Sequence, residues 1–164
     1  MDAPRPDAAQ IELDQALQAL KDEAISLHAE GLDVEEAVLY PPESRVTLYF
    51  GVAVSALLVE SVTFRIDDGA PQTVPLDERQ AKALLRDQSL MRLARVNVSP
   101  GAHRVSAEFR GRFADAKADS PPVSARYEAI FDKALAPAEL ELRVTRRSRR
   151  AEPQLDLREW RPAR

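Results

Sequence analysis

The chain contains no cysteine, only two histidines and only five glycines. The absence of cysteine excludes disulfides, thiolate metal sites and cysteine nucleophiles together. With His28 and His103 as its only imidazoles, one chain has too few of them for a multi-histidine metal centre. Few glycines give little support to a phosphate-binding loop, and neither Gly-x-Ser-x-Gly nor His-Glu-x-x-His occurs. We therefore predict a protein that is not an enzyme and that holds no cofactor or metal.

Aromatic residues and long apolar runs are also scarce. Aromatics make up 5% of the chain, which argues against a stacking platform for single-stranded nucleic acid. The longest apolar run, Gly51 to Val59, is far shorter than the roughly 20 residues of a membrane-spanning helix. Hydrophobic residues nevertheless make up 45% of the 164 residues, enough to bury a core. These proportions indicate one folded domain that does not span a membrane.

Four parts can be distinguished along the chain. Residues 1–7 hold two prolines and no apolar cluster, which predicts a flexible lead-in. Residues 8–31 predict a helix and residues 39–145 predict the main domain. Residues 146–164 form a basic C-terminal segment.

The predicted N-terminal helix carries a narrow apolar stripe. Its members follow one another at spacings of 4, 3, 4 and 3 residues, the rhythm of a helix seam. Gly31 is expected to end the helix, because glycine readily takes the left-handed position after a last turn. Three roles are open for the stripe: packing on its own domain, self-association, or docking to a partner protein. The stripe consists of Leu13, Leu17, Leu20, Ala24 and Leu27.

After Pro41-Pro42, apolar residues alternate with polar ones, which is the period of a β-strand. About seven such runs at short spacing predict a mainly β protein, an antiparallel two-sheet β-sandwich. A tight turn is expected at Asp67-Asp68-Gly69, and a short inserted helix with Asp77 as its N-cap. The predicted strands are 46–58, 62–66, 72–76, 89–98, 103–110, 123–131 and 140–144. The predicted core contains Phe50, Val52, Phe64, Ile66, Val105, Phe109, Tyr127, Phe131, Leu140 and Leu142.

The net charge of −4 conceals a strong polarity along the chain. Residues 1–43 hold eleven acids against two bases, whereas residues 143–164 hold eight arginines against three acids. Opposite charges of this size favour contact between the two regions, within one chain or between chains.

Arg146, Arg147, Arg149 and Arg150 form the sharpest local feature. Arginine clusters bind phosphates and carboxylates through paired hydrogen bonds, so nucleic acid, anionic lipid and an acidic protein face are the candidate ligands. The competing interpretation is a solvated strand end that balances the acidic helix. For His103, which follows the Pro100-Gly101 turn, a bond to the nearby loop is more common than a role as catalytic base.

Several short motifs occur in a recognisable order. They are Leu39-Tyr40-Pro41-Pro42 with Arg45, Ser61-Val62 with Asp67-Asp68-Gly69, Gly101-Ala102-His103, and Arg158-Glu159-Trp160. In this order they resemble a group of poorly characterised proteobacterial envelope proteins, predicted to be periplasmic and β-rich. Some of those proteins occur beside tetratricopeptide-repeat proteins. The resemblance implies an envelope protein, with a helical-repeat protein as a possible partner, and it supplies no catalytic residues.

We therefore expect a non-enzymatic accessory or interaction module of a bacterial envelope assembly. The location is the periplasm if a signal peptide has been removed, and the cytoplasm if Met1 is the native start. Two alternatives remain open: a DNA-associated regulator that uses the arginine run, and a carbohydrate-binding sandwich. The predicted partner-binding residues are Leu13, Leu17, Leu20, Leu27, Arg146, Arg147, Arg149 and Arg150.

Overall fold

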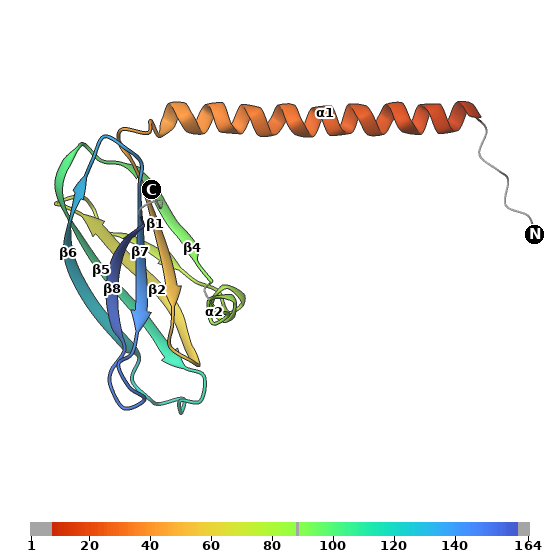
Figure 1. Cartoon of the computed structure of the whole chain (residues 1–164). Helices are drawn as coiled ribbons and strands as arrows, with labels where there is room; N and C mark the ends of the chain where they lie inside the picture. Colours follow the sequence, from red (N-terminus) through yellow and green to blue (C-terminus); the bar gives the residue numbers. More distant parts are fainter. Residues whose placement is uncertain (1–7, 88, 161–164) are drawn as a thin grey trace, which may run out of the picture. The chain divides into compact units, whose positions relative to one another are not determined.

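The structure is a computed structural model that describes residues 8–87 and 89–160 (Figure 1). It contains two compact units, which meet in the sequence between Pro41 and Pro42. The predicted lead-in, residues 1–7, lies outside the described residues. Among the described residues, neither helix has the length and apolar character needed to cross a membrane.

The first unit contains one helix, α1 (Ala8–Leu39), which at 1.5 Å per residue is about 48 Å long. The prediction that the helix ends at Gly31 is wrong, because α1 continues for two more turns. Gly31 does not take a positive φ, and one glycine inside a helix costs only about 1 kcal/mol. The helix ends instead before Tyr40, because Pro41 disfavours the helical conformation of the residue preceding it.

The second unit consists of two four-stranded sheets, which confirms the predicted mainly β, two-sheet architecture (Figure 1). It has eight strands where about seven were predicted. The first sheet, sheet A, has the order β4 (Met91–Asn97), β1 (Arg45–Val52), β7 (Ala138–Thr145) and β8 (Gln154–Trp160). The second, sheet B, has the order β3 (Gln72–Pro75), β2 (Leu57–Ile66), β5 (Gly101–Phe113) and β6 (Val123–Lys133).

The single strand predicted over residues 46–58 is in fact two strands in different sheets. A tight turn separates β1 from β2, in which Ala56 has a φ of 60° and the Leu57 amide donates to the Val54 carbonyl. Val54 and Leu57 are both buried on either side of this turn. The apolar pattern therefore runs through the turn, which is why it does not reveal the change of sheet.

Two further features differ from the prediction. Strands β1 and β7 are parallel, whereas all other pairs are antiparallel. Alternation reports which face of a strand is buried and not the direction of its neighbour. In addition, the basic C-terminal segment is not only a tail, because residues 154–160 form β8 at the edge of sheet A.

The core lies between the inner faces of the two sheets. Of the ten predicted core residues, eight are buried, and Ile66 and Tyr127 are partly buried against them. The short helix α2 (Glu78–Leu84) adds Ala81 and Leu84 to the buried set. Its N-cap is Asp77, as predicted, and the Asp77 carboxylate accepts a hydrogen bond from the Gln80 amide at 2.7 Å. The predicted turn at residues 67–69 is also present, with Asp67 at a φ of 49°.

Lys133 is buried at the end of β6, and its ammonium group is held by backbone oxygens. The Nζ donates to the carbonyls of Glu43, Ala134 and Ala136 at 2.8, 2.7 and 2.6 Å. Burial lowers the pKa of Lys133. The three bonds match the three donors of an ammonium group, and they tie the β6–β7 turn to the segment that enters β1.

Replacing Phe64 by Ala tests the packing between the sheets. Phe64 is 2% exposed in β2, so removing its ring leaves a cavity facing sheet A. We expect the free energy of unfolding to fall by roughly 3–5 kcal/mol, measured by chemical denaturation. Ile130→Ala is the matched control, because Ile130 is 70% exposed and its loss should change stability by about 0.5 kcal/mol or less. Equal effects of the two changes would contradict the assigned core.

Candidate functional site

The exposed face of α1 extends the stripe that the sequence predicted. Leu13, Leu17, Leu20 and Leu27 are between 61% and 70% exposed. Because the helix continues to Leu39, the same 4-and-3 spacing runs on through Gly31, Val34 and Val38, and both valines are exposed. We call this surface the α1 seam: Leu13, Leu17, Leu20, Ala24, Leu27, Gly31, Val34 and Val38. It spans more than three heptads, enough for a sustained helix–helix contact.

Acidic side chains border the α1 seam on both sides. In heptad terms Asp14 and Glu35 lie on one flank and Glu23 and Glu30 on the other. Lys21 is the only basic residue of the whole helix, which carries eight acids. The flanking positions hold these four acids against Lys21 and His28, so α1 presents an apolar stripe between flanks of net negative charge.

The structure divides the arginine run. Arg146 is half-buried, and its guanidinium donates to the carbonyls of Ala151 and Arg149. The same group lies 5.2 Å above the centre of the Phe113 ring, a cation–π contact. Arg146 thus closes the β7–β8 turn and packs it on β5. This intramolecular role distinguishes it from the other predicted partner-binding arginines.

Arg147, Arg149 and Arg150 are exposed in the β7–β8 turn. Beside them lies an open hollow of about 610 Å³ whose polar lining includes Ser55, Asp115 and Ser148. We call the three arginines the basic turn. Binding of an anionic partner by the basic turn stays a prediction.

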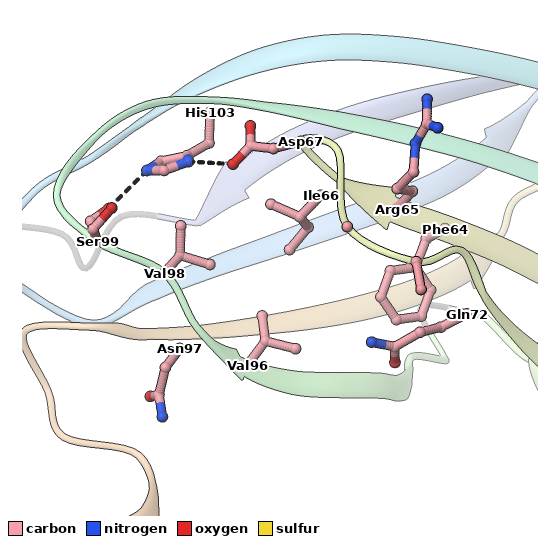
Figure 2. Close-up of a pocket in the computed structure, with 12 residues that line it drawn as sticks. Phe64, Arg65, Ile66, Asp67, Gln72, Val96, Asn97, Val98, Ser99 and His103 are labelled. Atoms are coloured by element: carbon pink, nitrogen blue, oxygen red, sulfur yellow. Dashed lines mark hydrogen bonds and ion pairs between the residues drawn. The ribbon is translucent and has the colours of Figure 1, made fainter.

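At the other end of the sandwich, His103 joins two turns (Figure 2). Its Nδ1 lies 2.6 Å from Oδ2 of Asp67 in the β2–β3 turn, and its Nε2 lies 2.7 Å from the Ser99 carbonyl before β5. Asp67 Oδ1 also accepts from the Arg104 amide at 2.8 Å. The imidazole packs on Phe131, with ring centres 5.8 Å apart. As predicted, the histidine bonds to a nearby loop; its bond to Asp67, 36 residues away, has no signal in the sequence.

The partners of His103 determine its protonation state. A carbonyl oxygen only accepts hydrogen bonds, so Nε2 must carry a proton to bond Ser99. The Asp67 carboxylate likewise accepts from Nδ1, so the ring is satisfied best as an imidazolium. Hydrogen bonding to Asp67 raises the pKa of His103, and bonds from Arg104 and His103 lower the pKa of Asp67. With both nitrogens donating, the ring has no lone pair left to accept a proton.

We call the hydrogen-bonded pair of Asp67 and His103 the Asp67–His103 clasp. Next to it is a hollow of about 400 Å³ between the β2–β3 turn and the end of β4 (Figure 2). Phe64, Ile66, Val96 and Val98 form its apolar part, and His103 stands at its rim. No signal in the sequence pointed to it, because its lining comes from segments about 30 residues apart.

Sheet A carries a second cluster that the sequence did not reveal. Because its neighbours Leu140 and Leu142 point into the core, Glu141 points away from it. The Glu141 side chain is nevertheless only 1% exposed. Its Oε2 accepts from Trp160 Nε1 at 2.6 Å, and its Oε1 accepts from Arg143 Nε. The alternation over residues 139–145 predicts a solvated outer face, because it does not show that an indole and a guanidinium cover the carboxylate.

Comparison with protein-family models, curated proteins and solved structures gave no match. The resemblance to envelope proteins therefore stays a prediction. Within residues 8–87 and 89–160, no three His, Asp or Glu side chains gather as a metal ion would require.

Raising the pH should weaken the Asp67–His103 clasp. The folded pKa of His103 lies above its ordinary value of 6.5, so its stabilisation is complete below about pH 6.5 and is lost as the pH rises through the raised pKa. The Asp67 contribution is present above about pH 3.8 and is lost as the pH falls through the lowered pKa.

Chemical denaturation between about pH 5.5 and about pH 9 measures this loss, which cannot exceed about 1.4 kcal/mol per pH unit for one proton. We expect the free energy of unfolding to fall more over this pH range for the native chain than for the His103→Gln variant. Parallel curves for the two proteins would show that the clasp carries no stability linked to protonation.

The basic turn provides a test of the DNA-binding alternative. We expect no measurable binding of duplex DNA at physiological salt in an electrophoretic mobility assay, because three exposed arginines neutralise few phosphates. Submicromolar binding that weakens steeply with salt, and that disappears in R147A/R149A/R150A, would support the alternative instead. Arg146 stays unchanged in this variant because it holds the turn together.

Proposed function

We propose that this protein is a non-enzymatic interaction module that docks to a partner protein through the α1 seam. The observation that carries the proposal is the row of exposed leucines, continued by Val34 and Val38, along one side of a 32-residue helix. Exposed apolar surface of this extent typically marks a protein contact. A second helix with a matching seam is the partner surface that fits a narrow stripe.

The charges beside the seam favour a partner other than a second copy. In a parallel pair of identical helices, Glu30 of one chain would face Glu35 of the other, and like charges across a seam are unfavourable. In an antiparallel pair, Glu23 and Glu30 would face each other. A partner helix with lysines or arginines beside its own seam converts these repulsions into attractions. The proposed partner is therefore a helix with basic flanks, of the kind that a helical-repeat protein can supply.

The absence of enzymatic activity is part of this proposal. His103 uses both ring nitrogens as donors, and Lys133 uses its ammonium group on three carbonyls. A general base or nucleophile needs an available lone pair, and neither group has one in this arrangement. These contacts support a structural role for both side chains.

A bacterial envelope assembly is the proposed setting, and the periplasm is the proposed compartment. The support is the order of motifs from Leu39 to Trp160. Cell fractionation with the native gene and its own start tests this part. Recovery in the cytoplasmic fraction alone would contradict it without touching the role of the α1 seam.

A synthetic peptide tests the docking directly. A helical peptide with leucines at seam positions and lysines on its flanks should bind the full chain, measured by fluorescence anisotropy. Leu17→Asp with Leu20→Asp should abolish binding, since two buried carboxylates in a helix contact are costly. A lower melting temperature of this variant in isolation would instead assign the α1 seam to packing on its own domain and contradict the proposal.

The matched control is Ile11→Asp with Ile25→Asp, which adds the same charge to α1 away from the α1 seam. This control should bind the lysine-flanked peptide as the native chain does. If a glutamate-flanked peptide binds as tightly as the lysine-flanked peptide, the acidic flanks do not contribute to partner choice, which contradicts that part of the proposal. A dimer in light scattering that L17D/L20D converts to a monomer would assign the seam to self-association and contradict the proposal.

A further inference from the structure

Two polar side chains of sheet A are buried although they lie on its outer face, which points away from the core between the sheets. Thr47 and Glu141 both point away from the core, yet they are 2% and 1% exposed. Outward-facing side chains of a two-sheet sandwich are normally solvated. Other side chains must therefore lie over them on this face.

Each covering side chain is held by a specific contact. Arg95 in β4 donates to the Thr47 hydroxyl at 3.3 Å, and Trp160 in β8 donates to Glu141. Leu90 lies over Gly51, where an added Cβ would come within 3.0 Å of the Leu90 methyl group and 3.5 Å of the Arg143 guanidinium. A side chain at Gly51 would displace this layer, so glycine permits the close approach.

The result is a layer of aromatic and arginine side chains, which we call the sheet A platform. Its members lie on neighbouring strands, because Tyr49 is opposite Arg92 on one side and opposite Glu141 on the other, and Glu141 is opposite Arg158. The platform consists of Tyr49, Leu90, Arg92, Arg95, Glu141, Arg143, Arg158 and Trp160.

The composition of the platform matches that of interface hot spots. Tryptophan, tyrosine and arginine carry most of the energy of protein–protein contacts. Trp160 is 48% exposed although its indole nitrogen is fixed on Glu141, so the free edge of the ring is presented in one orientation. A side chain held in place before binding loses less conformational freedom when a partner docks.

Charge indicates what the platform binds. The outward positions of sheet A hold five arginines, at 45, 92, 95, 143 and 158, against the acids Glu139, Glu141 and Asp156. Glu141 is paired with Arg143, which leaves four of the arginines against Glu139 and Asp156. The exposed part of the face is therefore positive.

We propose that the sheet A platform binds an acidic segment of a partner protein, with Trp160 as its apolar anchor and with Arg92 and Arg158 as carboxylate ligands. Guanidinium groups pair with carboxylates through two parallel hydrogen bonds. A peptide can carry acidic residues at the positions that face the arginines and neutral residues elsewhere. A continuous phosphate backbone would in addition meet Glu139 and Asp156, which repel it, so a protein segment fits this face better than nucleic acid.

The single tryptophan of the chain makes the platform directly observable. Poly-L-glutamate added to the full chain should shift or quench the emission of Trp160 and saturate, whereas poly-L-lysine should not. Arg92→Glu with Arg158→Glu should weaken this binding about tenfold or more, because charge reversal replaces attraction by repulsion. Arg92→Gln with Arg158→Gln, which is gentler on the fold, should weaken it by an intermediate factor.

The matched control is Arg147→Glu with Arg149→Glu, the same charge reversal in the basic turn. It should leave the binding of poly-L-glutamate within about twofold of the native chain, apart from a general charge effect that salt removes. If this control abolishes binding and the platform variant does not, the basic turn is the site and the proposal is overturned. Absence of any saturable change at Trp160 overturns it as well.

Two further measurements separate this proposal from its alternatives. Tighter binding of duplex DNA than of poly-L-glutamate, lost in R92E/R158E, would assign the platform to nucleic acid and overturn the proposal. The L17D/L20D variant should bind poly-L-glutamate normally, since the α1 seam and the platform are different surfaces. The proposed function and the platform can therefore fail independently.

Discussion

The contact between the inner faces of the two sheets is the interaction on which the other features depend. Phe50, Leu140 and Leu142 of sheet A meet Phe64 and Phe109 of sheet B, and all five are buried. Because each strand buries one face in this contact, its other face and the loops at its ends remain accessible for other sites. The sheet A platform, the basic turn and the Asp67–His103 clasp all occupy such positions.

Buried and half-buried polar groups complete the sandwich at places where hydrophobic packing alone would leave donors or acceptors without partners. Lys133 holds three carbonyls at one end, and His103 joins the turns before β3 and β5. Among the described residues, no buried side-chain nitrogen or oxygen is without a hydrogen-bond partner. Such fully satisfied networks favour one arrangement of the loops over others.

The candidate sites differ in how far the sequence revealed them. Periodicity within one helix suffices to find the leucines of the α1 seam. The predicted stripe is too short because the helix was expected to end at Gly31. Local charge suffices to find the arginine run, but its division into Arg146 and the exposed arginines depends on Phe113, which is more than 30 residues away. Glu141 and Trp160 come from different strands, and only strand pairing brings them together.

What the sequence by itself determined is the local part: alternation marks the strands and their buried faces, Asp77 caps a helix, and Asp67 begins a turn. These follow from interactions between residues a few positions apart. The tertiary structure alone decided that β1 and β2 belong to different sheets, that β1 runs parallel to β7, and that a carboxylate on an outer face is covered. Each of these depends on which strands become neighbours, and an apolar pattern carries no information about the partner against which it packs.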